Sequence, residues 1–396
     1  MQPILTKLAD SHILRAAVAS FWNYSGRLVG LAWTALLISK LGVGDYGKYS
    51  IGVAAAAIIN AGIDNAFFVR SLRVEEREYQ RERCARVIFG SAIGAVGVAV
   101  FFEWYIAGFA IVVAAGELLF NTFKSQYLRA ARPDIAMRFD AIRQLVSIGL
   151  GGAYVLLVPE PKLSVVTALY VAPYLVIMLV TWTYVPGRKP APPGGLKEMS
   201  LLSSEAFAAA VYGQGDLLII GFLAGDRVAG MYSLALVTAL AISTIGQNYA
   251  NTFIDGLREA KGHTDSAPAL KNVLRVAAVT CSVMVTIGVG VLIWGGADLV
   301  GVVFLILAVW VFLRTINHVL IVILFLQHRD ALRVRATVGA AVLKIAVLFA
   351  AVHFAGAYGA AVTTVVMEAG LLFVYYRAIY RTRAVPNDSP GEVVLP

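Results

Sequence analysis

Apolar segments of roughly 20 residues, the length at which a helix crosses a bilayer, alternate with short polar stretches along the chain. In the first half, this pattern predicts membrane-spanning helices at about 14–39, 49–69, 87–103, 105–127, 141–158 and 164–185. In the second half, it predicts them at about 201–223, 230–254, 272–294, 298–326, 336–355 and 358–377. The fold class we expect is therefore all-α, a polytopic membrane protein with about 12 transmembrane helices.

A short motif that follows the first predicted span recurs in the second half. Residues 41–50 read LGVGDYGKYS, and residues 224–233 read AGDRVAGMYS. Both stretches lie between two predicted spans, so they occupy equivalent places in the topology. The matching positions are Gly42, Gly47, Tyr49 and Ser50 in the first copy and Gly225, Gly230, Tyr232 and Ser233 in the second. Duplicated halves of this kind are common among secondary transporters.

Between the halves, residues 186–195 read PGRKPAPPGG, a composition that cannot continue a helix. The linker, the repeat and the number of spans together predict two six-helix lobes. We place the N-lobe at 1–185, a cytoplasmic linker at 186–195, the C-lobe at 196–378 and a cytoplasmic tail at 379–396.

Composition agrees with this prediction, since 59% of the residues are hydrophobic and only 14% are charged, against about a quarter charged in soluble domains. The net charge of +9 is informative about topology. Lys and Arg concentrate in alternate loops, and the opposite loops hold only Lys40, Lys48, Lys162 and Arg227. Because positively charged loops stay in the cytoplasm, both termini are expected there.

Several motifs of other protein classes fail here. Residues 42–48 resemble a phosphate-binding loop, but Tyr49 stands where a magnesium-binding Ser or Thr is required. Cys84 and Cys281 are too few for a disulfide framework or a metal site. The first apolar segment contains Asn23 and Arg27, so it does not read as a cleavable signal peptide. We expect no enzyme, no metal site and no nucleic-acid partner.

Polar residues inside the predicted spans are the candidates for function, because a charge there costs about 2.5–3.5 kcal/mol on insertion scales. Several lie one helical turn apart and therefore share a face. These pairs are Asn23 and Arg27, Asn60 and Asp64, Glu117 and Asn121, Tyr212 and Asp216, and Arg314 and His318. They predict a polar interior shared by both halves.

Arg27, Glu117 and Arg314 are expected near the midplane of the membrane. Basic groups at that depth suit an anionic head group such as a phosphate or diphosphate. The alternative is an internal ion pair, for example between Arg27 and Glu117, that only fixes helix packing. For Lys344 and Glu368, on consecutive antiparallel spans at similar depth, a structural ion pair is the favoured interpretation.

The residues resemble a known family at two places. The first is residues 41–50 followed by an Ala-rich span that ends in Ala61-Gly62-Ile63-Asp64, and the second is residues 216–221 followed by 229–235. These stretches resemble Wzx-type polysaccharide flippases of the multidrug/oligosaccharidyl-lipid/polysaccharide exporter superfamily. The chain departs from that family in being short, in its minimal loops, and in basic positions that match no fixed pattern.

The resemblance implies two lobes arranged as a V around a cationic central cavity, with Arg27 and Asp216 on cavity-lining helices. It also implies translocation of polyprenyl-diphosphate-linked sugars across the cytoplasmic membrane by alternating access. The expected partners are a lipid-linked glycan, membrane lipids, and a polysaccharide polymerase or glycosyltransferases. No cofactor is expected, although coupling to H⁺ or Na⁺ stays open.

From these arguments the predicted cavity residues are Arg27, Asn23, Arg314, Asp216 and Tyr212, and the candidates for ion coupling are Asp64, Asp216 and Glu117. Two alternatives to a flippase remain. A multidrug exporter of the same superfamily would favour an acidic cavity for cationic drugs, and a non-transporting membrane scaffold would need no polar stripes inside its spans.

Overall fold

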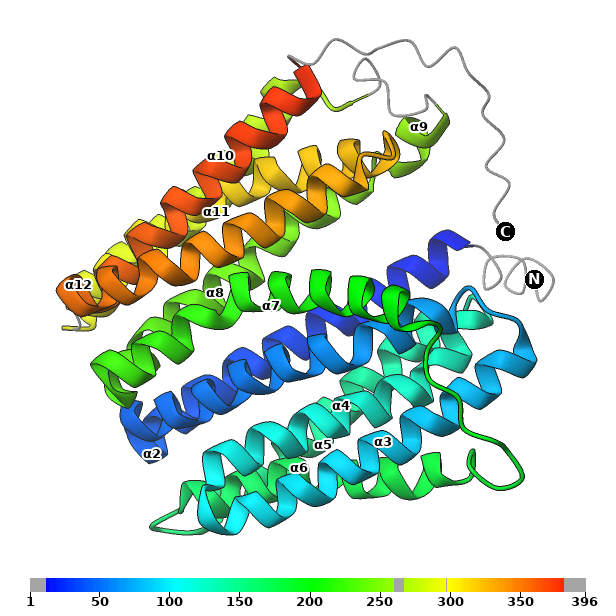
Figure 1. The fold of residues 1–396 in the computed structure, drawn as a ribbon. Coiled ribbons are helices and arrows are strands. Elements are labelled where there is room, and N and C mark those ends of the chain that lie inside the picture. The colour runs from blue at the N-terminus through cyan, green and yellow to red at the C-terminus, as the bar shows by residue number, and fades with distance from the viewer. Residues whose placement is uncertain (1–11, 260–266, 297, 381–396) are drawn as a thin grey trace, which may run out of the picture.

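A computed structural model describes residues 12–259, 267–296 and 298–380, and within these ranges the protein is built of helices without a strand (Figure 1). The helices are α2 (His12–Ser71), α3 (Glu76–Glu103), α4 (Tyr105–Arg129), α5 (Pro133–Leu157), α6 (Leu163–Trp182), α7 (Leu196–Ala224), α8 (Asp226–Asn251), α9 (Ile254–Glu259), α10 (Leu270–Trp294), α11 (Asp298–Leu326) and α12 (Asp330–Tyr380).

The two longest helices each contain two predicted spans. Non-helical backbone angles interrupt α2 at Gly42 and α12 at Gly356, so the two arms of each form a tight hairpin with almost no loop. Of the described helices, nine are long and apolar enough to cross a membrane, and these two are among them. The more polar α5 occupies the place of the fifth predicted span. The expected polytopic, all-helical fold is confirmed.

The repeat seen in the sequence has the same backbone geometry in both copies. Gly42 has φ 82° and ψ 168°, and its counterpart Gly225 has φ 88° and ψ 166°. A positive φ strains residues that carry a Cβ, whereas glycine adopts it readily. The matched glycines therefore make the same sharp turn, between the two arms of α2 in one half and between α7 and α8 in the other.

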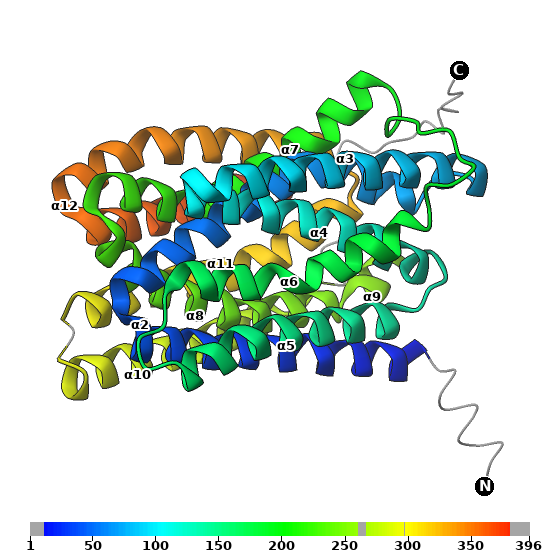
Figure 2. The same ribbon diagram turned by 90° about the horizontal axis from the view of Figure 1, so that it is seen from below.

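The helices pack as two lobes. In the N-lobe, α2 packs on α4 and α5, α3 on α4, and α6 on α4 and α5. In the C-lobe, α11 packs on α8, α10 and α12, and α12 packs on α7. The lobes meet where α2 contacts α7 and α8. In Figure 1 α2 and α7 accordingly lie in the middle of the molecule, and Figure 2 shows the same bundle from below.

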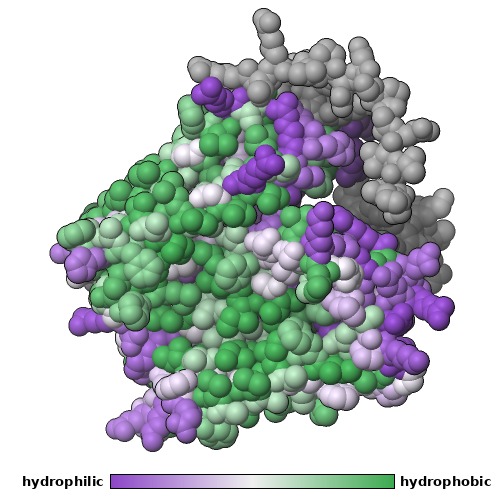
Figure 3. All heavy atoms as spheres, in the orientation of Figure 1, coloured by the Kyte–Doolittle hydropathy of each residue, from purple (hydrophilic) through white to green (hydrophobic). Residues whose placement is uncertain are grey.

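Hydrophobic side chains cover the middle of the visible face, and hydrophilic ones gather at the ends of the helices (Figure 3). We call the end that carries the α2–α3 and α4–α5 connections the inner end, after the predicted orientation, and the end that carries Gly42 and Gly225 the outer end. Many large hydrophobic side chains of these helices are exposed, among them Leu179, Phe222 and Phe354. This surface is what a bilayer requires of a multi-pass protein.

Candidate functional site: a cavity between the lobes

A cavity of about 320 Å³ lies where the two lobes meet. Both arms of α2, together with α5 and α6, supply its N-lobe wall, and α7 and α8 supply its C-lobe wall. Its polar lining residues are Arg27, Thr34, Tyr46, Tyr49, Ser50, Gln144, Tyr170, Gln214 and Ser233. Since both lobes contribute, a relative movement of the lobes changes the cavity.

Arg27 is the one charged side chain among the described residues that line this cavity. Its Nε atom is buried and has no hydrogen-bond partner among the described residues. A guanidinium left with a free donor in a cavity is suited to bind an anion, above all a phosphate, because its planar fork matches the phosphate oxygens. The placement of Arg27 agrees with the cavity role and not with the alternative of an Arg27–Glu117 pair.

Gln144 lies against the same stretch of α2 as Arg27 because α2 carries glycines opposite it. A Cβ at Gly26 would lie 2.7 Å from Gln144 Oε1, and one at Gly30 would lie 3.2 Å from Gln144 Nε2. The absence of side chains at these two positions lets the amide of α5 lie against the α2 backbone. Asn23 lies one turn before Arg27 on the same helix, and its side chain is outside the described part of the structure.

An aromatic cluster forms the N-lobe side of the cavity. Trp33 Nε1 donates a hydrogen bond to Tyr49 Oη at 3.1 Å, which joins the two arms of α2. The ring of Trp33 also stacks on Tyr170, with centroids 6.4 Å apart and an interplanar angle of 17°. These contacts hold hydroxyl groups and flat apolar faces in fixed positions around the space next to Arg27.

Contacts between the lobes flank the cavity. Tyr46 Oη and Ser233 Oγ lie 3.3 Å apart and share a hydrogen bond that joins α2 to α8 on the outer side. On the inner side, Asn248 Nδ2 donates to Tyr24 Oη, again between α8 and α2. Arg27 therefore lies between two polar contacts that must break if the lobes separate.

The other predicted cavity residues are held inside the C-lobe, and one predicted ion pair is wrong. Lys344 pairs with Asp216 at 2.7 Å, and both side chains are fully buried. Asp216 also accepts hydrogen bonds from Tyr232 and Thr364, each at 2.7 Å. The expected partner of Lys344 was Glu368. Asp216 thus anchors α7 to α8 and α12 and is not among the residues that line the cavity.

Glu368 is the centre of a second buried cluster. Its carboxylate pairs with Arg314 at 3.3 Å and accepts hydrogen bonds from Tyr212 at 2.9 Å and Asn317 at 2.7 Å. The indole of Trp310 donates to it at 3.2 Å. Arg314 and Tyr212, predicted to line the cavity, are therefore partners of a buried carboxylate and do not line it.

The two N-lobe carboxylates predicted for ion coupling are also paired. Asp64 forms an ion pair with Arg86 and accepts a hydrogen bond from Asn121 at 2.7 Å. Glu117 lies 3.1 Å from Arg143 and accepts a hydrogen bond from the Tyr174 hydroxyl at 2.6 Å. Each carboxylate joins neighbouring helices of one lobe, so protonation would weaken packing inside that lobe.

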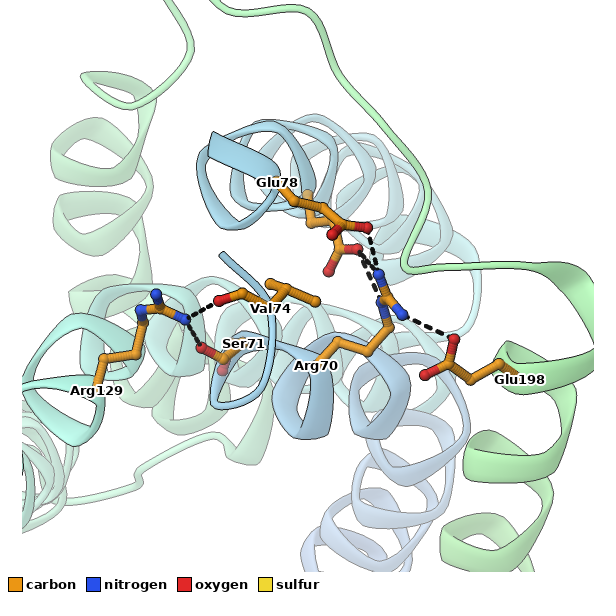
Figure 4. Close-up of polar contacts among 7 residues, drawn as sticks. Arg70, Ser71, Val74, Glu78, Arg129 and Glu198 are labelled. Carbon is orange, nitrogen blue, oxygen red and sulfur yellow. Dashed lines mark hydrogen bonds and ion pairs between the residues drawn. The ribbon is translucent and has the colours of Figure 1, made fainter. Parts of the chain in front are cut away.

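At the inner end, Arg70 joins three helices (Figure 4). Its guanidinium lies 2.5 Å from Glu78 and 2.7 Å from Glu82 on α3, and 2.7 Å from Glu198 on α7. Arg129 of α4, also drawn in Figure 4, donates to the backbone carbonyls of Ser71 at 2.6 Å and Val74 at 2.9 Å. Arg70 thus ties the first turn of the C-lobe to the N-lobe.

Two further pockets, of about 590 and 460 Å³, are larger than the central cavity. The first lies between α2, α3, the linker and α7, and the second between α4, α5 and α6. Their linings are mostly apolar, and in the second Arg143 is already paired with Glu117. In the second pocket the Arg143 Nε also lacks a partner among the described residues, but the guanidinium is held by Glu117 and Tyr174. The central cavity is the better candidate for a polar ligand, because its lining carries more polar groups and comes from both lobes.

The sequence analysis did not identify the uncharged amide and hydroxyl side chains that line the cavity. Gln144 and Gln214 were not singled out, although amides within membrane spans are uncommon and mark polar contacts. Tyr49, Ser50 and Ser233 were noticed only as repeat positions. The repeat was a partial signal, because Ser50 and its counterpart Ser233 both line the cavity, whereas Tyr232, the counterpart of Tyr49, bonds to Asp216 inside the C-lobe.

The fold defines the class of molecule as a two-lobed helical membrane protein of the kind found in transporters. Over 92% of this chain and 87% of the other, it is similar to a structure titled lipid II flippase MurJ, inward closed conformation, with a TM-score of 0.69 and 10% sequence identity. It is also similar to the MATE multidrug transporter DinF-BH, with a TM-score of 0.55, 11% identity and coverage of 94% of this chain and 95% of the other. No family profile matches the chain, and no curated protein matches it. At these identities the likeness shows the fold alone.

Proposed function

We propose that the protein is a flippase that moves a polyprenyl-(di)phosphate-linked sugar or oligosaccharide from the inner to the outer leaflet by alternating access. The observation that carries this proposal is Arg27, whose buried Nε has no partner among the described residues and which lies in a cavity between the lobes. A phosphate group satisfies that guanidinium, and the surrounding amides and hydroxyls suit a sugar. The lipid chain stays in the bilayer.

The geometry supports a movement of the lobes as the transport step. The cavity is bounded by contacts between α2 and α8 on both sides, and these contacts are hydrogen bonds between small polar groups. When a phosphate neutralises Arg27, the free energy of the closed cavity falls relative to the empty one. Binding therefore favours the lobe arrangement that encloses the head group.

Coupling to protons or sodium belongs to the same proposal. Asp216 is the carboxylate best placed for it, because its neighbours on α7, Gln214 and Leu217, line the cavity while Asp216 itself holds Lys344 and Tyr232. Protonation of Asp216 would release Lys344 and loosen α7 from α8 and α12. The other two candidate carboxylates are each bound to an Arg inside the N-lobe, so their protonation acts within one lobe.

A multidrug exporter is the second candidate, since one of the similar structures is a multidrug transporter. A site for cationic drugs needs a carboxylate in the cavity. The described lining residues include Arg27 and no carboxylate. A scaffold without transport gives no reason for a polar cavity between the lobes that is lined by Arg27, which makes no ion pair among the described residues. Both alternatives are therefore less well supported than the flippase.

The test is extraction of lipids from cells that lack this protein, compared with cells that contain it. Accumulation of a polyprenyl-linked sugar on the cytoplasmic side would support the flippase and identify the substrate. No accumulation, together with new sensitivity to cationic drugs, would overturn the flippase proposal in favour of the exporter.

A further inference from the structure

The size of the cavity restricts the head group that fits in it. The volume is about 320 Å³. At the packing density of organic solids, a hexose takes roughly 200 Å³ and a phosphate roughly 60 Å³. One sugar unit with one phosphate therefore fills the cavity, and an oligosaccharide would have to extend beyond it.

Independently of its size, the charge of the cavity limits how many negative charges the head group can carry. Among the described lining residues, the single guanidinium of Arg27 is the only charge, and the other polar groups are neutral amides and hydroxyls. A phosphodiester carries one negative charge and is neutralised by one guanidinium. A diphosphate carries two negative charges, so one of them would remain without a counterion between membrane-spanning helices, which is unfavourable.

The neutral lining fits the rest of such a head group. Gln144 on α5 and Gln214 on the opposite lobe offer donors and acceptors for hydroxyl groups. The partly exposed ring of Tyr170, which stacks on the buried Trp33, offers an apolar face for the C–H side of a sugar ring. A single polyol ring thus finds partners on both lobes at once, so its binding joins the lobes.

We infer that the ligand of this cavity is a lipid whose head group is one sugar-sized polyol joined through a single phosphodiester. This inference rests on the proposed flippase function and narrows its substrate from the wider class of mono- and diphosphate-linked glycans. The same chemistry occurs in two lipid sources, a polyprenyl-phosphate sugar and a glycerophospholipid with a polyol head group. The test separates them.

The full-length protein is reconstituted into nanodiscs of phosphatidylcholine, and dissociation constants are measured for four probes. The probes are farnesyl-phospho-glucose, farnesyl-diphospho-glucose, a farnesyl-diphospho-pentasaccharide and phosphatidylinositol. We expect farnesyl-phospho-glucose to bind about tenfold more tightly than either diphosphate probe, because the second charge stays unpaired. Equal or tighter binding of a diphosphate probe overturns the inference and leaves the flippase proposal standing.

Two outcomes of this experiment also test the proposed flippase function. If phosphatidylinositol binds and no farnesyl probe does, the phosphodiester inference holds and the polyprenyl flippase proposal fails. If no probe binds, both fail. These outcomes differ from tight diphosphate binding, so the two proposals are tested separately.

A second cation in the cavity provides a test by gain of function. Gln214 lines the cavity from α7, and we expect Gln214→Lys to shift the preference about tenfold toward farnesyl-diphospho-glucose, since the added charge pairs with the second phosphate. The matched control is Gln80→Lys, because Gln80 lies on α3 away from the cavity and bonds to Glu76 there. An unchanged preference in a folded Gln214→Lys protein contradicts the inference.

Discussion

Gly47 and Gly230 occupy equivalent positions in the two copies of the repeat, and their backbones touch across the boundary between the lobes. A Cβ at Gly47 would lie 1.8 Å from Asp226 O and 3.0 Å from Gly230 N. A Cβ at Gly230 would lie 2.3 Å from Val43 O and 3.1 Å from Gly47 N. Val43 and Asp226 are themselves equivalent in the repeat, so the crossing is pseudo-symmetric. Only glycine allows helices to approach so closely.

This crossing closes the cavity at its outer end, and it gives a first prediction. Gly47→Ala should hinder closure, because overpacking of a tight contact costs about 1–3 kcal/mol, which lowers the ratio of closed to open protein about 5- to 150-fold. The measurement is cross-linking, by a short bifunctional thiol reagent, of cysteines at Tyr46 and Ser233, whose hydroxyls are 3.3 Å apart, in a protein with Cys84 and Cys281 replaced. The cross-link should form more slowly in the Gly47→Ala background.

Gly44→Ala is the matched control, since nothing lies within 4 Å of a Cβ at Gly44. It should leave the rate of cross-linking unchanged. If Gly47→Ala cross-links as fast as the parent protein, the Gly47–Gly230 contact does not control closure of the outer end.

The repeat is also the part of the structure that the sequence predicts best. The motif matched Gly42 with Gly225 and Gly47 with Gly230, and the structure has the same turn at the first pair and a mutual contact at the second. The predicted spans correspond to helices for a similar reason. Hydrophobic length and glycine conformation are local properties, and local properties can be read from a sequence.

Side-chain partners were harder to predict because they depend on rotation about the helix axis. Lys344 and Glu368 were placed at similar depth, but depth does not say which neighbour a side chain faces. Lys344 faces α7 and bonds to Asp216, whereas Glu368 faces α11 and bonds to Arg314. The cavity hydroxyls were missed because a hydroxyl in a helix often bonds to its own backbone, as Thr167 does to the carbonyl of the residue four positions earlier at 3.0 Å.

A second prediction concerns Arg27. Arg27→Ala should abolish transport and leave the amount of protein in the membrane near normal, because the Arg27 Nε has no partner among the described residues. Transport is measured as clearance of the accumulated lipid in the deletion strain, and protein by quantitative blotting of membranes. Arg27→Lys keeps the positive charge but loses the planar, forked set of guanidinium donors, so it should retain part of the activity. Loss of the protein from the membrane in Arg27→Ala would make Arg27 a structural residue instead.

A third prediction concerns the buried pair of Lys344 and Asp216. Lys344→Met should destabilise the protein by about 3–5 kcal/mol, since it leaves the Asp216 carboxylate buried without its cation. Adding Asp216→Asn should recover a large part of that loss. The measurement is the unfolding temperature in detergent, for the two single variants and the double variant.

Glu368→Gln serves as the control for this cycle. Because Glu368 bonds to Arg314 and Tyr212, its substitution should add to the effect of Lys344→Met without rescuing it. Rescue of Lys344→Met by Glu368→Gln, and not by Asp216→Asn, would contradict the pairing found in the structure.

A fourth prediction is that the carboxylates around Arg70 differ in their contributions to stability and to lobe movement. The Glu198 side chain is 44% exposed, so Glu198→Gln should cost only about 0.2–1 kcal/mol of stability. The Glu82 side chain, in contrast, is only 4% exposed. Arg70→Met leaves Glu82 buried and unpaired and should cost about 3–5 kcal/mol.

Glu198 is nevertheless the carboxylate that joins the lobes. Glu198→Gln should therefore change the rate of lobe movement more than the unfolding temperature. Cross-linking across the outer end at low and at high salt measures this rate, and the difference between Glu198→Gln and the parent should shrink at high salt, which screens the exposed charge. An equal loss of stability in both variants, with no change in cross-linking, would show that Arg70 only fastens the helix ends.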